Sequence, residues 1–289
     1  APENPGARDW ANEGLKGLKE FDPSNLKTTG FLMSQQLHIN QDGTFEIILS
    51  QKDPGPGKNW MQLQPNSNCI MIRLVWTDRE KEFAPQFKIA RADGAEPEPL
   101  TPALMANNLA WAGQAVVGYA ELVRNWWKGT QGNFSAKLNR LDYSRAQYLT
   151  NGGVADRHVA FGGWLKPKGE ALVLEFDPPV AEYWNFQLCN LWQENLDTFE
   201  DGNGYVTNYN HKVDPDGKVR IYIADKDPGL GGNWVNSFGH ERGIWGLRLI
   251  RTEKTTPVKL WRVKLAELES GKNSVLEPSA AIDTGQFVD

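Results

Sequence analysis

Histidine and acidic side chains in the last third of the chain are the residues best suited to chemistry. The chain has only four histidines, and two of them are His211 and His240. Glu194 and Asp227 lie in the same stretch. An imidazole oriented by a carboxylate can act as a general base, because histidine titrates near neutral pH. Two imidazoles and a carboxylate could instead bind zinc or iron, and structural hydrogen bonding is the third interpretation.

Motif spacing does not choose between these interpretations. The chain contains no His-Glu-x-x-His, no Cys-x-x-Cys and no facial-triad pattern, so both a metal and a cofactor stay unknown. Glu194 and Asp197 precede a polar loop that could bind calcium, but the twelve-residue EF-hand loop is missing and a solvated turn is the favoured interpretation. Gly-x-Ser-x-Gly and Gly-x-Gly-x-x-Gly are also missing, which leaves serine-nucleophile and nucleotide chemistry unsupported.

Aromatic and amide side chains accompany the candidate catalytic groups. The chain has 12 tryptophans, and although most large indole rings belong in a core, such a surplus also suits a site for a partly apolar molecule. We therefore predict a pocket in the second half of the chain, with His211, His240, Glu194 and Asp227 as its catalytic groups. The residues predicted to bind the ligand are Trp184, Gln187, Trp192, Asn210, Asn233 and Trp234.

A sequence pattern that occurs twice predicts the scaffold. Ten of the nineteen residues in Asp42–Trp60 recur in Asp216–Trp234 at an offset of 174. In each copy, alternating apolar residues after an Asp-Gly turn predict a strand with one buried face. Asp-Pro-Gly then predicts a tight turn, with Asp53 and Asp227 capping their own backbone. We expect tandem β hairpins built from one shared unit.

Apolar alternation continues beyond both copies. Ile70–Trp76 and Trp245–Leu249 are predicted strands, with Arg73 and Arg248 on the face opposite the core at an offset of 175. Further strands are expected at residues 172–176, 183–191 and 258–263. The expected fold class is mainly β: duplicated antiparallel β-sandwich or jelly-roll-like modules with a helical connection between them.

A helix is expected between the two copies. Thr101 and Pro102 suit an N-cap and a first helical position, and the helix should run to about Trp127 and end at Gly129–Gly132. The residues expected on its buried stripe are Leu104, Asn108, Ala112, Val116, Tyr119 and Val123. The expected domains are a first β module over residues 1–90, truncated or diverged at its start, a proline-rich linker and helix over 91–150, a second β module carrying the site over 151–268, and a polar tail over 269–289.

Composition restricts the partners. The net charge is −5 and the basic residues are scattered, which argues against nucleic acid. No apolar run reaches the roughly 18 to 20 residues of a membrane span, so we expect a soluble protein. Cys69 and Cys189 are too far apart for a disulfide framework and are expected as small buried residues. A start at Ala1, without methionine or a signal-like segment, fits a processed chain, a trimmed one or a fragment.

An ordered series of motifs resembles the C-terminal signature of a bacterial protein family. The series begins with Tyr-Trp-Asn-Phe-Gln-Leu at 183–188 and continues through Asn210-His211, Asp227-Pro228-Gly229, Asn233-Trp234 and Gly239-His240. Residues 161–268 thereby resemble domain-of-unknown-function family 1214, which is often found with family 1254. The resemblance implies a β-sandwich-type fold and no established activity. The family's usual pattern has strands ahead of the first Asp-Gly, whereas Asp9–Leu32 here is typical of a helix or loop, so that part is missing or has diverged.

Three functions fit the sequence. The first is an enzyme or enzyme-like protein with the pocket described above, which should fail when His211 and His240 are replaced. The second is a non-catalytic carbohydrate- or lipid-binding sandwich, which should depend on an exposed tryptophan instead. The third is a structural or assembly subunit, as a homo-oligomer or with an upstream partner segment, which light scattering would test.

Overall fold

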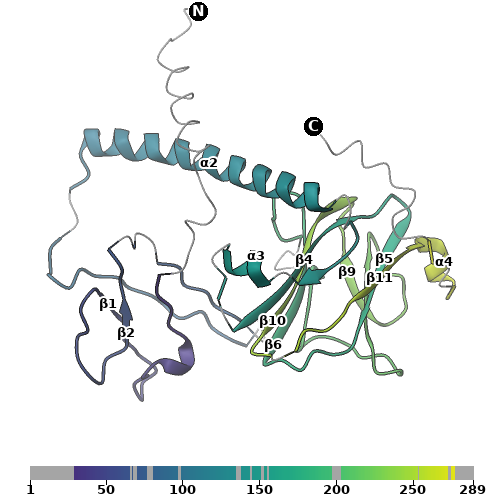
Figure 1. Ribbon diagram of the computed structural model, residues 1–289, viewed down its shortest axis with the longest axis horizontal. Helices are drawn as coiled ribbons and strands as arrows, with labels where there is room; N and C mark the ends of the chain where they lie inside the picture. Colours follow the sequence, from purple (N-terminus) through teal and green to yellow (C-terminus); the bar gives the residue numbers. More distant parts are fainter. Residues whose placement is uncertain are drawn as a thin grey trace, which may run out of the picture.

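The computed structural model of the chain describes residues 29–65, 67, 70–76, 81–96, 99–134, 138–143, 145–150, 153–154, 156–196, 203–252, 254–272 and 275–276. Most of the segment Asp9–Leu32 lies outside these residues, as do Cys69 and Asp197. The described part contains a two-stranded sheet, a long helix and a β-sandwich (Figure 1).

Two sheets form the sandwich. The first has the order β3-β4-β10-β6-β7 and is antiparallel throughout. Its strands are β3 (Asp142–Tyr143), β4 (Arg157–Leu165), β10 (Arg242–Ile250), β6 (Tyr183–Cys189) and β7 (Tyr205–Thr207). The second has the order β11-β5-β8-β9. Its strands are β11 (Lys259–Lys264), β5 (Glu170–Phe176), β8 (Val219–Ala224) and β9 (Asn233–Asn236). The mainly β, sandwich-like fold predicted from the sequence is confirmed.

Apolar alternation produces the core between the sheets. Successive side chains of a strand point to opposite faces, so every second residue enters the core. Leu247 and Leu249 of β10 are fully buried there, as are Ile221 and Ile223 of β8. A smaller cluster lies on the outer face of the second sheet, where the short helix α4 (Leu265–Glu269) packs over β5 and β11.

The repeated pattern forms a parallel strand pair in both copies, and the expected hairpins were wrong. In the first copy β1 (Ile48–Ser50) pairs parallel with β2 (Trp60–Gln62), as β8 does with β9. The chain reverses direction at the Asp-Pro-Gly turn after the first strand. It reverses again before Asn59 or Asn233, so the next strand runs parallel to the first. Gly55 and Gly229 have φ values of 99° and 74°, which glycine tolerates at such turns.

An asparagine side chain holds this second reversal in both copies. Asn59 Oδ1 accepts a hydrogen bond from the His38 amide at 2.6 Å, and its Nδ2 donates to the His38 and Glu46 carbonyls, both at 2.9 Å. Asn233 makes the same bonds with Lys212, at 2.6 and 2.9 Å, and with Arg220, at 2.8 Å. We call each set an asparagine clamp. The amide side chain thus provides hydrogen-bond partners for backbone groups that have no partner on a neighbouring strand.

The first copy has less structure around it than the second. Ile70–Trp76, predicted as a strand, forms none, and Met71 and Ile72 are 70% and 55% exposed. The equivalent strand β10 is hydrogen-bonded on both sides, to β4 and β6. Among the described residues, no strands flank 70–76 in this way, so its alternating pattern has no sheet to join. A short 3₁₀ helix, η2 (Ser34–Gln36), precedes β1.

The long helix α2 (Pro102–Phe134) starts as predicted and continues beyond the expected stop at Gly129–Gly132. Thr101 Oγ1 caps it by accepting a hydrogen bond from the Leu104 amide at 3.1 Å. The predicted buried stripe is largely wrong, since Val116 and Tyr119 are 71% and 60% exposed. Only the sandwich end of the helix contacts β4, with Val123 buried, while the rest extends away as a rod (Figure 1). No helix among the described residues is long and apolar enough to cross a membrane.

Candidate functional site

Four of the predicted site residues lie at one end of the sandwich, where β4, β6 and β8 end and β10 begins. Trp192 and Glu194 are on the exposed turn after β6, where the Glu194 carboxylate accepts a hydrogen bond from Asn190 at 2.6 Å. His240 is exposed just before β10, and Asp227 is exposed on the loop that follows β8. The Asp227 carboxylate accepts the Gly229 amide at 2.9 Å, the turn-capping role expected for it.

Four others lie toward the opposite end. His211 precedes β8, and its ring packs at 5.0 Å from that of Trp184, which is 1% exposed in the core. The buried Nδ1 of His211 has no hydrogen-bond partner among the described residues. Asn210 accepts a bond from the Thr207 amide at 2.6 Å, and Asn233 forms the second asparagine clamp.

The two histidines therefore do not share a pocket. His240 precedes Arg242 at the start of β10, and His211 packs on Trp184, which pairs with Leu249 near its end; these two strand positions are about 23 Å apart at about 3.3 Å per residue. Trp184 is core and cannot wall an open site, and Trp234 lies on the other sheet, with its Nε1 donating to the Ala224 carbonyl at 3.1 Å. No three His, Cys, Asp or Glu side chains gather as metal ligands within the described ranges. Although His211 and His240 belong to one segment of the sequence, β8 and β9 lie between them, and the chain crosses the sandwich before it reaches His240.

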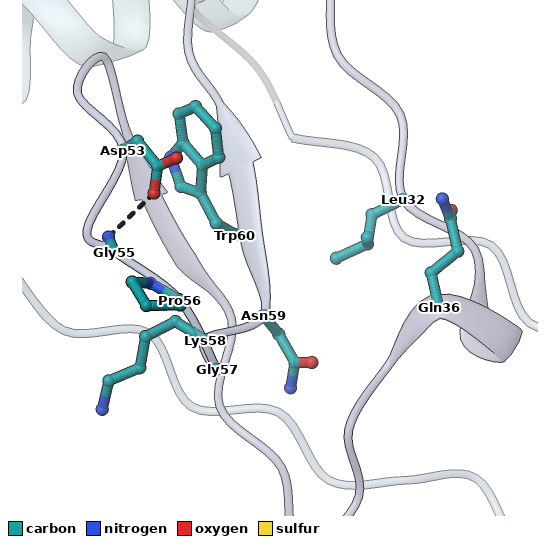
Figure 2. A pocket seen from close by; sticks show the side chains of 9 residues that line it. All are labelled: Leu32, Gln36, Asp53, Gly55, Pro56, Gly57, Lys58, Asn59 and Trp60. Atoms are coloured by element: carbon teal, nitrogen blue, oxygen red, sulfur yellow. Dashed lines mark hydrogen bonds between the residues drawn. The ribbon is translucent and has the colours of Figure 1, made fainter.

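An open hollow of about 480 Å³ lies beside the first copy, lined by Leu32, Gln36 and the loop Asp53–Trp60 (Figure 2). The Asp53 carboxylate there accepts the Gly55 amide at 2.8 Å, so it is occupied with the turn. Lys58 and Gln36 are exposed, and Asn59 is part of the first asparagine clamp. The hollow thus holds no pair of side chains arranged for acid-base work.

The tenth predicted residue, Gln187, belongs to a polar cluster on the outer face of the first sheet. Gln187 and Asn185 alternate with core residues of β6, and Arg248 alternates with core residues of β10. The register pairs Arg248 with Asn185, and Arg248 Nη1 donates to Gln187 Oε1 at 2.9 Å. We call these three residues the arginine cluster.

The arginine cluster holds a cation without an anion. Arg248 forms no ion pair with any residue that the structure describes. Burial lowers the pKa of its guanidinium, Cys189 and Tyr148 oppose that shift, and the positive charge of Arg73 adds to it. The buried Oδ1 of Asn185 likewise has no partner in the described part of the chain. A partly buried charge without a counter-ion and a buried amide oxygen without a hydrogen-bond partner are both unfavourable, so the cluster suits a polar ligand.

Aromatic and small side chains surround the cluster. A Cβ placed on Gly246 would lie 3.6 Å from Arg248 Nη1 and 3.8 Å from the Phe161 ring, so both groups border the Gly246 position. Tyr148 comes from α3 (Arg145–Thr150), which packs against β4 (Figure 1). Burial raises the pKa of the Cys189 thiol against the effect of Arg248, which keeps it protonated near neutral pH and disfavours it as a nucleophile.

Of the three residues of the arginine cluster, only Gln187 was among the predicted site residues, and Arg248 and Asn185 were not. Arg248 was used only to check the register of the two copies. A usable signal was present: an arginine between buried apolar residues, with no acidic residue at alternate positions of its own strand.

The buried cation Lys166 is fully paired. Lys166 is 0% exposed, and its Nζ lies 3.2 and 3.1 Å from the two carboxylate oxygens of Asp225. Ser237 Oγ donates to the same carboxylate at 2.6 Å. Burial raises the pKa of Asp225, but the bonds from Ser237 and Lys166 outweigh it and the pKa is lowered overall. This cluster ties β4 to β8 and β9 and leaves no free charge for a ligand.

Comparisons with known proteins identify a family and one structure of similar fold, and they name no activity. A family model described as "Protein of unknown function (DUF1214)" matches residues 21–79 and 165–254, more than half of the chain. The crystal structure of an uncharacterised protein from Burkholderia cenocepacia is 30% identical with a TM-score of 0.74, covering 83% of this chain and 65% of that one. A protein from Vibrio parahaemolyticus is 14% identical over 57% of this chain and 47% of that one, and its TM-score of 0.31 is too low to indicate a common fold. No curated protein matches the sequence significantly.

Proposed function

This chain belongs to the DUF1214 family of proteins of unknown function, and we propose that it binds a small, partly apolar carboxylate at the arginine cluster of its second β module. The observation that carries this proposal is Arg248, a partly buried cation with no ion-pair partner among the described residues. A guanidinium presents five donors in a planar fork that matches a carboxylate. Within the part of the chain that the structure describes, only Nη1 is used, by Gln187, so the other donors are available to a ligand.

The neighbouring groups support a ligand with an apolar part. Phe161 lies beside the guanidinium across Gly246, and Tyr148 and Tyr183 are near enough to influence its pKa. Arg73 adds a second positive charge from outside the sandwich. Such a mixture of a few fixed polar groups and aromatic surface is usual for small-molecule sites.

Binding fits the cluster better than catalysis does. Of the nucleophiles nearby, Cys189 has a raised pKa and is mainly a thiol at neutral pH. His240, Glu194 and Asp227 lie at the end of the sandwich where β10 begins, whereas Arg248 is near the end of β10. His211 packs against the core residue Trp184, and Arg248 is on the outer face of the sheet. We therefore propose a receptor-like or carrier-like role.

The test is titration calorimetry with hexanoate and benzoate, each compared with its uncharged amide. We expect the carboxylates to bind, and Arg248→Gln to weaken them by about 10- to 100-fold, the usual worth of a hydrogen bond to a charged group. Arg91→Gln is the matched control, because Arg91 is exposed and paired with Asp93 in the linker. Equal affinity for acid and amide would contradict a carboxylate site.

A stability measurement separates a ligand site from a structural arginine. If Arg248 is held ready for an anion, Arg248→Met should leave the free energy of unfolding unchanged or raise it, because an unpaired desolvated charge is removed. If Arg248 serves the fold, the same change should destabilise the protein strongly, and the proposal fails.

A second candidate function is an assembly subunit made from a duplicated unit, and exposed apolar surface favours it. Trp111 on α2 is 72% exposed, and Phe83 and Ile89 ahead of the helix are 93% and 80% exposed. Large exposed apolar surfaces usually mark contacts with other proteins. Light scattering across a concentration series, alone and with cell-derived partners, tests this role, and a strictly monomeric, partner-free chain would count against it.

A further inference from the structure

We propose that a strand from a separate polypeptide pairs antiparallel with the open edge of β1, with apolar residues at alternate positions and a lysine or arginine facing Glu46. This inference deepens the assembly role and rests on it. It follows from comparing the surroundings of β8 with those of β1, residue by residue.

β8 shows what the repeated strand pairs with. On one side it is parallel to β9, and on the other β5 pairs with it antiparallel, joining Leu172 to Ile223, Leu174 to Ile221 and Phe176 to Val219. These six side chains lie in the core between the sheets. The strand β5 thus supplies both backbone hydrogen bonds and an apolar row.

β1 lacks that second neighbour. It forms a two-stranded sheet with β2, and within the described ranges no strand lies on its other edge. Because Ile48 N and Ser50 O bond toward the β2 side, the backbone groups of Ile47 and Leu49 point to the open edge. An open edge of this kind is a template for another strand.

The apolar row is also incompletely covered. Phe45, Ile47 and Leu49 correspond to Val219, Ile221 and Ile223 of β8 at the offset of 174. The β8 residues are 0% exposed, whereas the three in the first copy are only partly buried. Among the described residues, Phe87 packs edge-on against Phe45, with ring centroids 6.3 Å apart.

A charge reversal defines the chemistry of the partner. In the second sheet Glu175 of β5 pairs with Arg220 of β8, with 2.6 Å between Arg220 Nη2 and the carboxylate. The residue equivalent to Arg220 in the first copy is Glu46, which is exposed and forms no ion pair within the described part of the chain. Opposite charges stabilise directly facing strand residues and like charges destabilise them. A strand on β1 should therefore carry a basic residue where β5 carries Glu175.

A matched pair of peptides tests this directly. The first has the sequence of residues 169–177, which includes β5, and the second carries Glu175→Lys. Binding to the whole chain is followed by fluorescence polarisation of labelled peptides. We expect the lysine peptide to bind roughly tenfold more tightly than the original, since a like-charge pair becomes an opposite one. The variant Glu46→Lys should invert the preference, and Glu96→Lys, an equal charge change in the exposed linker, should not.

Methylated peptides test the pairing without changing the protein. N-methylation at the positions of Leu172 and Leu174 removes the donors that face the strand edge, so binding should be lost. Methylation at Val173 and Glu175 should have little effect. Equal binding of the two charge variants, or indifference to methylation, overturns the edge proposal.

Light scattering separates the two levels of the argument. If the chain assembles but neither peptide binds, the edge proposal fails and the assembly role stands. If it neither assembles nor binds a peptide, both fail. If Glu46→Lys abolishes self-association, the occupant is a second copy of the chain, which overturns the assignment to a separate polypeptide.

Discussion

Replacement of the two clamp asparagines by alanine should have unequal effects, although both make the same hydrogen bonds. Asn233 is 6% exposed and makes three bonds to backbone groups, at 2.6, 2.9 and 2.8 Å. Each such bond contributes about 1 kcal/mol, so Asn233→Ala should lower the free energy of unfolding by about 3 kcal/mol, and more if the freed groups stay dry. Asn59 is partly exposed, and water can replace its lost bonds. We expect about 1 kcal/mol for Asn59→Ala.

Urea denaturation followed by tryptophan fluorescence and far-ultraviolet circular dichroism measures both changes. Coincident transitions from the two probes are needed before free energies are compared. Asn233→Asp is a useful third variant: it keeps the acceptor but turns a carboxylate toward the Lys212 and Arg220 carbonyls, so it should be as harmful as alanine. Equal losses at the two sites, or a loss below about 1 kcal/mol at Asn233, would refute the argument that burial sets the strength of the clamp.

Other predictions concern packing, a thiol and a charge. Gly162→Ala should destabilise the sandwich by about 3 kcal/mol or more, because its Cβ would lie 1.8 Å from the Arg140 carbonyl oxygen, whereas Gly246→Ala, with 3.6 Å to its nearest neighbour, should change the unfolding free energy by less than about 1 kcal/mol. Cys189 should be alkylated by iodoacetamide at pH 8 more slowly than a free thiol, with a rate that rises with pH, and fast labelling would contradict its raised pKa. The lowered pKa of Asp225 means that its stabilising effect is complete above the ordinary carboxyl pKa and is lost as pH falls through the folded value. The difference in unfolding free energy between wild type and Asp225→Asn, measured by urea titration, should therefore begin to shrink below about pH 4, and a constant difference would disprove the linkage.

Local patterns in the sequence identified most of the strands and their faces. Alternation placed Leu247 and Leu249 in the core with Arg248 opposite, as observed. It failed at Ile70–Trp76, because a strand forms only beside other strands, and the local sequence does not show whether such neighbours are present. It also failed for the parallel pairing after Asn59 and Asn233, since parallel strands usually need a longer connection than these loops provide.

The predicted site failed for a different reason. Ligand sites are built from residues that converge in space, and the positions of His211 and His240 depend on which end of a strand each flanks. Only strand order and register provide that information. Gln187 was identified through a family motif, while its partner Arg248 lies 61 positions away and becomes its neighbour only through the pairing of β6 with β10.

The opposite charges at Glu46 and Arg220 also bear on how this chain avoids misfolding. Proteins with two similar units risk exchanging strands between them while they fold, or between molecules at high concentration. If β5 were misplaced onto β1, Glu175 would face Glu46 instead of Arg220, and the wrong pairing would be electrostatically penalised. One reversed charge can thus direct each strand to its own half of the molecule, so a chain that carries the same strand pattern twice can still fold in a single way.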